Sequence, residues 1–150
     1  MPNYIYKFCC SSLVYLFSIP VFAMENVEVT SAWINQPPPG VTTVAGYMNI
    51  QNTRETPIIL TGASSPVFTR IEFHLSRENN GVVSMQKVES IEIAPGETFS
   101  FSPGQYHLML FLAEESMETG SFIPITLEFS GQESIEIKAV LRRGLSHHQH

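Results

Sequence analysis

Residues 122–141 read FIPITLEFSGQESIEIKAVL, two runs of alternating apolar and polar residues on either side of the turn sequence SGQE at 130–133. A period of two places the apolar side chains of each run on one face of a β-strand. Glycine and small polar residues between the runs are typical of a turn. This stretch therefore predicts two half-buried strands separated by a turn.

The same alternation continues through most of the chain. Short runs rich in β-branched and aromatic residues, which favour strands, lie at 27–34, 43–52, 57–64, 68–76, 81–89, 90–95, 97–103 and 106–113. Turn sequences such as PPPG at 37–40 and ENNG at 78–81 separate them. No stretch sustains a helical period, and AEESMETGS at 113–121 is typical of a loop or a single turn. We therefore expect one all-β domain, an antiparallel β-sandwich, without internal repeats.

The first 23 residues have the features of a secretory signal peptide. Lys7 precedes the uncharged apolar run FCCSSLVYLFSIPVFA, which ends in Val21-Phe22-Ala23 with small residues at its first and third places. About 16 apolar residues are short for a membrane span. Cys10 is followed by more apolar sequence, which argues against a lipoprotein. We expect a cleaved leader at 1–23, a folded domain at 24–141 and a disordered tail at 142–150.

Removal of the leader changes the chemistry available to the protein. Both cysteines, Cys9 and Cys10, lie in it, so the remaining chain has no disulfide, no thiolate nucleophile and no cysteine metal ligand. A blue-type copper electron-transfer centre, which needs a cysteine thiolate, is excluded as well. Without Lys7, the remaining chain has seven basic and fourteen acidic side chains. This balance argues against nucleic acid and anionic membranes as partners, and we expect no stable membrane insertion after cleavage.

Signals for catalysis are weak. The chain has no G-x-S-x-G turn, no phosphate-cradling glycine loop and no dinucleotide fingerprint. Its glutamates fall mostly at outward positions of strands, as in SIEIKAVL at 134–141, where a solvated face is the simpler interpretation. The sequence therefore offers no site for an exported hydrolase, and we expect a protein that is not an enzyme.

Histidine and methionine form the one promising group. In QYHLMLF, residues 105–111, His107 and Met109 share one face of a strand. His74 lies on the polar face of 68–76, and the turn ENNG brings the strand of Met85 back beside it, so that Ser76 and Met85, or their neighbours, lie across from each other. Each residue alone has a structural explanation, because a single strand histidine is more often surface or hydrogen-bonded and a sandwich methionine usually fills the core.

The spacing of these residues resembles that of a known family. His74, Met85, His107 and Met109 read H-x10-M-x21-H-x-M, the motif of the periplasmic copper chaperone family PCuAC. Blocks similar to that family's occur in the same order, among them SAWINQPPPG, AGYMNIQN, GASSP, SIEIAPGE and PGQYHLMLF. The resemblance spans Val27 to about Leu141. One departure is Ser76, where family members often carry a further methionine.

The resemblance implies a cupredoxin-like β-sandwich in the periplasm that binds Cu(I) through His74, Met85, His107 and Met109. It also implies a recipient, the dinuclear copper centre of a cytochrome c oxidase, or another periplasmic copper protein. The chemistry agrees, because neutral thioether sulfur with imidazole favours Cu(I) over hard ions. Only the two histidines must lose a proton to bind.

Other interpretations remain open at this point. The same four residues suit a periplasmic protein of copper storage or tolerance that releases its metal more slowly. A β-sandwich that only binds other proteins would carry the histidines and methionines by coincidence. The tail histidines His147, His148 and His150 are a separate group that could take Cu(II) or Zn(II), although a solvated tail is the simpler interpretation.

Overall fold

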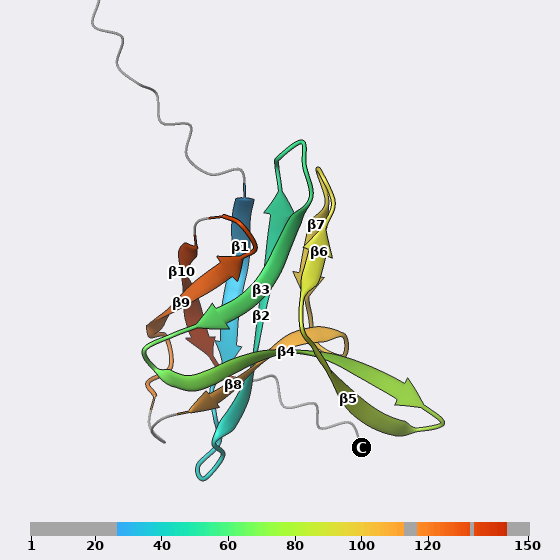
Figure 1. The fold of residues 1–150 in the computed structure, drawn as a ribbon. Coiled ribbons are helices and arrows are strands. Elements are labelled where there is room, and N and C mark those ends of the chain that lie inside the picture. The colour runs from blue at the N-terminus through green and yellow to red at the C-terminus, as the bar shows by residue number, and fades with distance from the viewer. Residues whose placement is uncertain (1–26, 113–116, 133, 144–150) are drawn as a thin grey trace, which may run out of the picture.

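The computed structural model describes residues 27–112, 117–132 and 134–143, and within these ranges it contains ten strands and no helix. The strands are β1 (Val27–Asn35), β2 (Thr43–Asn52), β3 (Ile58–Ser64), β4 (Phe68–Asn79), β5 (Val82–Val88), β6 (Ile91–Ile93), β7 (Thr98–Phe101), β8 (Tyr106–Leu112), β9 (Phe122–Phe129) and β10 (Ile135–Arg142) (Figure 1). Each falls on a predicted run, so the all-β prediction is confirmed. No helix in these ranges is long and apolar enough to cross a membrane.

Two predicted segments lie outside the described residues. They are the signal peptide at 1–23 and the part of the tail that carries His147, His148 and His150. The strand β10 ends at Arg142, one residue beyond the predicted end of the folded domain.

Hydrogen bonds join the strands in the order β5-β4-β8-β2-β1-β10-β9-β3-β6, and β7 pairs with β2. All pairs are antiparallel except β1 with β10, which run parallel with Trp33 opposite Val140. A parallel pair needs a long connection, and here nearly the whole domain lies between the two strands. The predicted antiparallel sandwich is thus confirmed, with one parallel pair near the chain ends that the local pattern did not predict.

One hydrophobic core holds the sheet together. Ile50 of β2, Leu60 of β3, Leu108 of β8 and Leu127 of β9 are fully buried and belong to the same cluster. Strands that are distant in the sheet order meet in this core, so the sheet folds over on itself as a sandwich. Burial of each such side chain stabilises the fold by about 1.5–3 kcal/mol.

The β4–β5 hairpin projects from the sandwich (Figure 1). Its turn is formed by Asn80 and Gly81, which both have positive φ angles, 51° and 77°. Asn-Gly with two positive φ angles forms the tight two-residue turn that matches the twist of paired strands. The strand β5 lies at the edge of the sheet, and Val82, Val83 and Met85 are each more than half exposed.

Asn52, at the end of β2, is a fully buried polar residue. Its amide Nδ2 donates to the carbonyl oxygens of Thr56, Ile93 and Ala94 at 2.9, 3.0 and 3.2 Å. Its Oδ1 accepts a hydrogen bond from the backbone N–H of Arg54 at 3.0 Å. One side chain therefore joins the β2–β3 loop to the end of β6.

Candidate metal centre

The two histidines of the predicted site are direct neighbours. His74 of β4 and His107 of β8 lie opposite each other in the antiparallel pairing, and their ring centroids are 5.9 Å apart. Opposite residues of an antiparallel pair project from the same face of the sheet. His107 is only 6% exposed, and the side chain of His74 is 12% exposed. Two largely buried imidazoles therefore face one another.

Met109 completes a compact group with them. It lies two residues after His107 on the same face of β8, and it is opposite Glu72, two residues before His74. Its side chain is half-buried. The structure thus brings together three of the four predicted ligands, His74, His107 and Met109.

Met85 lies on the other side of β4. It is opposite Ser76, which is within the range of registers expected from the sequence, while Lys87 is opposite His74. Met85 therefore shares the face of the histidines and is diagonal to His74, but it is 57% exposed at the sheet edge. The four residues lie on one face of β5-β4-β8, which we call the His–Met face, and Met85 is its outermost member.

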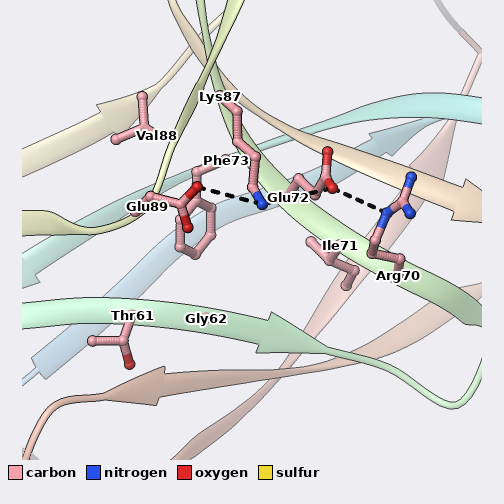
Figure 2. Close-up of a pocket in the computed structure, with 9 residues that line it drawn as sticks. All are labelled: Thr61, Gly62, Arg70, Ile71, Glu72, Phe73, Lys87, Val88 and Glu89. Atoms are coloured by element: carbon pink, nitrogen blue, oxygen red, sulfur yellow. Dashed lines mark ion pairs between the residues drawn. The ribbon is translucent and has the colours of Figure 1, made fainter.

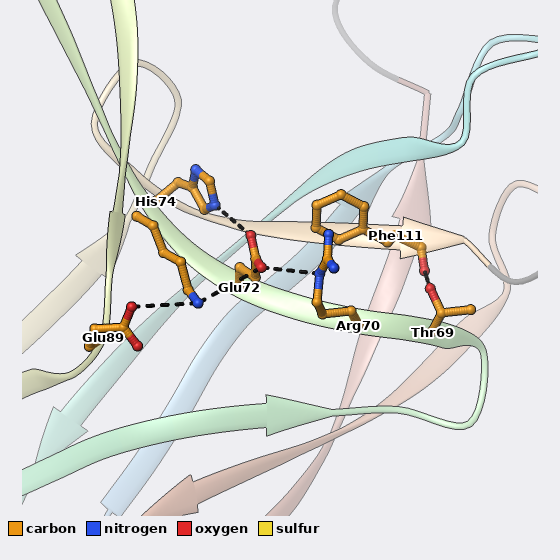
Figure 3. Close-up of polar contacts among 7 residues, drawn as sticks. Thr69, Arg70, Glu72, His74, Glu89 and Phe111 are labelled. Carbon is orange, nitrogen blue, oxygen red and sulfur yellow. Dashed lines mark hydrogen bonds and ion pairs between the residues drawn. The ribbon is translucent and has the colours of Figure 1, made fainter.

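Glu72 is a member of this face that the sequence analysis did not select. Its Oε2 lies 2.9 Å from Nε2 of His74, and its Oε1 lies 3.1 Å from Nε of Arg70 and 3.9 Å from Nζ of Lys87 (Figure 3). The hydrogen bond from His74, with the positive charges of Arg70 and Lys87, holds the pKa of the Glu72 carboxyl below its usual range, although burial opposes this. The E-x-H spacing on one strand was the available signal.

In the part of the chain that the structure describes, His74 and His107 each keep one ring nitrogen without a hydrogen bond to another residue. Nδ1 of His107 lies 3.1 Å from the backbone oxygen of Gln105, which can only accept, so this Nδ1 donates and Nε2 carries the lone pair. Nδ1 of His74 is buried and has no hydrogen-bond partner among the described residues. Buried polar nitrogens normally have a partner. The two histidines are therefore suited to donate their free lone pairs to a metal ion.

Methionine sulfur is needed to complete a metal site at this place. In the part of the chain that the structure describes, no three His, Cys, Asp or Glu side chains converge as a metal-binding group. Two imidazole nitrogens with one or two thioether sulfurs form a neutral, soft donor set. The His–Met face can therefore bind a soft monovalent ion without burying a charged ligand.

A surface pocket adjoins this face (Figure 2). It lies between β3, β4 and the end of β5, with Gly62, Phe73 and Glu89 in its lining. Arg70, Glu72 and Lys87 also line it, but none of the four predicted ligands does. The pocket thus meets the His–Met face at Glu72, which belongs to both.

Comparison with known proteins finds a matching sequence family and solved structures with the same fold. A family model described as "Putative lipoprotein LpqE-like" matches residues 27–141. The "Putative lipoprotein Lxx21020" of Leifsonia xyli subsp. xyli is 32% identical over 107 residues, which cover 71% of this chain. The same alignment covers 63% of that protein, so the chain matches under two thirds of its relative.

Several solved structures share the fold. The copper-bound PCuAC domain from PmoF2 is similar with a TM-score of 0.68 and 22% identity, covering 82% of this chain and 97% of that one. Apo-DR1885 from Deinococcus radiodurans has a TM-score of 0.62 and 22% identity, covering 97% and 98%. The Cu(I) form of DR1885 has a TM-score of 0.63 and 23% identity, covering 77% of each chain. The predicted cupredoxin-like fold of PCuAC domains is confirmed.

Proposed function

The chain belongs to the LpqE-like family, and on that premise we propose that it is an extracytoplasmic Cu(I) carrier rather than an enzyme. The proposed ligands are His74, His107 and Met109, with Met85 as a fourth. The observation that carries the proposal is the direct pairing of His74 with His107, each with a ring nitrogen that has no hydrogen bond to the described residues.

The donor set agrees with a monovalent copper cargo. Thioether and imidazole are soft or intermediate ligands, and a set without a charged donor favours Cu(I) over Mg²⁺, Ca²⁺ or the usual zinc chemistry. A neutral set also releases its metal more readily, which suits a carrier. Two of the similar structures are named as copper-bound or Cu(I) forms, which supports copper as the cargo here.

The proposed recipient is an exported copper protein, with the dinuclear copper centre of cytochrome c oxidase as the specific candidate implied by the PCuAC resemblance. The exposed position of Met85 at the sheet edge supports delivery, because a partner's ligands can approach from that side. A protein of copper storage would bind the same ion but keep it when an acceptor is offered. Transfer to an apo-oxidase copper domain separates these two functions.

We expect the leader to be cleaved after Ala23 when the protein is exported. The family and the curated relative are both named as lipoproteins. In this chain Cys9 and Cys10 precede more apolar sequence. We expect the exported protein to begin at Met24 without lipid, as checked by intact mass after expression with the full leader. A mass that retains Cys9 or Cys10 with attached acyl chains would show a lipid anchor instead.

Copper binding is tested by anaerobic titration with Cu(I) against a competing chromogenic chelator. We expect the chain from Met24 to His150 to take one tight equivalent. A chain ending at Arg143, which keeps β10 intact, should bind equally well because it retains the His–Met face. Absence of a tight equivalent, or its loss with the tail alone, contradicts the proposed function.

A further inference from the structure

We propose that Glu72 is a positioning residue that selects the tautomer of His74, so that His74 binds Cu(I) through Nδ1 and His107 binds it through Nε2. This inference rests on the proposed function and specifies the bonding at the same site. It assigns a role to a carboxylate that is neither a predicted ligand nor an exposed charge.

The first step concerns the proton on His74. The Oε2 atom of Glu72 is 2.9 Å from Nε2 of His74, which is hydrogen-bond distance. Arg70 and Lys87 lie 3.1 and 3.9 Å from the other oxygen, Oε1, so donor groups surround both oxygens of this carboxylate. An ionised carboxylate can only accept hydrogen bonds, so Nε2 of His74 must carry the proton.

The second step concerns the remaining nitrogen. With its proton on Nε2, a neutral His74 has its lone pair on Nδ1. This atom is buried, has no hydrogen-bond partner among the described residues, and lies on the side of the ring away from Glu72 (Figure 3). A buried acceptor without a partner destabilises the fold. A metal ion bound at Nδ1 would satisfy it.

His107 shows the complementary arrangement. Its Nδ1 donates to the backbone oxygen of Gln105 at 3.1 Å, which leaves Nε2 as the nitrogen with a lone pair. A carboxylate for one histidine and a backbone carbonyl for the other are the usual outer partners of metal-binding imidazoles, and they fix ring orientation and tautomer. The two opposite histidines would therefore use different nitrogens for the same ion.

The proposal predicts both a spectrum and an affinity. Long-range ¹H–¹⁵N spectra of the apo-protein should show His74 protonated at Nε2. Addition of Cu(I) should shift Nδ1 of His74 and Nε2 of His107 and leave the Nε2 proton of His74 in place. Replacement Glu72→Gln should weaken Cu(I) binding by roughly 10-fold to 100-fold, the range for loss of an outer partner of a metal ligand.

Glu89→Gln is the matched control. It removes an equal charge, because Glu89 forms an ion pair with Lys87 at 3.5 Å. The side chain of Glu89 is 84% exposed, and this ion pair does not involve His74. We expect this variant to bind Cu(I) as tightly as the parent, and both variants to keep their melting temperature within a few degrees. A general effect of surface charge would weaken both variants equally and would contradict the inference.

Two results would overturn the role of Glu72 while leaving the proposed function intact. One is tight Cu(I) binding with the ¹⁵N shift at Nε2 of His74. The other is an unchanged affinity and tautomer in Glu72→Gln. Absence of Cu(I) binding to the parent protein is a different outcome that contradicts the proposed function itself, and the spectrum of the apo-protein still reports which nitrogen of His74 carries the proton.

Discussion

Met109→Leu is expected to weaken Cu(I) binding by more than about 100-fold, because loss of an outer partner alone costs 10-fold to 100-fold and Met109 is a proposed direct ligand. Leucine has nearly the volume of methionine and no sulfur, so packing on β8 is maintained. Met109 is half-buried beside His107, and its register partners are Glu72 of β4 and Ala45 of β2. Anaerobic titration against a chromogenic chelator measures the change.

Substitutions of two other methionines serve as comparisons for Met109→Leu. Met48→Leu is the control, because Met48 is a buried core residue of β2, and its Cu(I) affinity should equal that of the parent. Met85→Leu should weaken binding less than Met109→Leu does, because Met85 is 57% exposed on an edge strand. Equal affinities of the Met109→Leu and Met48→Leu variants would show that Met109 is not a ligand.

The strands and the β4–β5 hairpin could be predicted from the sequence because each depends on residues that are adjacent in the chain. Alternation with a period of two defined all ten strands, and it placed His107 and Met109 on one face. The ENNG turn predicted that the strand of Met85 returns beside that of His74, with Ser76 and Met85 or their neighbours across from each other, and the structure pairs Met85 with Ser76. A tight turn fixes the register of the hairpin that it closes, so a few adjacent residues are enough to predict it.

Pairing between distant strands could not be predicted in this way. His74 and His107 are 33 positions apart, and their alignment depends on β4 and β8 sharing the core around Leu108 and Phe73. The parallel pairing of β1 with β10 also joins the two ends of the domain. Such pairings result from packing of the whole sheet, which alternation within a single strand does not specify.

The chemistry around the site was predicted only in part. Glutamates at strand positions were interpreted as a solvated face, but Glu72 is 17% exposed and contacts His74. The spacing H-x10-M-x21-H-x-M also gives no information on which of its four residues are buried and which are exposed. The structure distinguishes a buried pair of histidines from the exposed Met85, because burial depends on the position of each strand in the sheet.

Asn52→Ala should lower the free energy of unfolding by about 2–4 kcal/mol, because buried groups that lose a hydrogen-bond partner cost about 1–3 kcal/mol each. The carbonyl of Ile93 is the most enclosed of the three acceptors, while those of Thr56 and Ala94 are partly buried. The melting temperature should fall by on the order of 10 °C, as measured by calorimetry. Asn49→Ala, on the same strand at a half-buried position, should have a smaller effect.

Asn52→Asp tests the contribution of the amide hydrogen bonds, because it removes the donor while the volume of the side chain stays nearly the same. Aspartate keeps an oxygen that can accept from the N–H of Arg54, but its second oxygen would face the carbonyl oxygens of Ile93 and Ala94 in place of the amide donor. Burial of an unpaired charge against acceptors is costly, so this variant should be at least as unstable as Asn52→Ala. If Asn52→Asp instead retained the parent's stability, the amide donor would contribute nothing. The link between the β2–β3 loop and β6 would then depend on apolar packing around Ile58 and Ile93, which are fully buried and opposite each other in the β3–β6 pair.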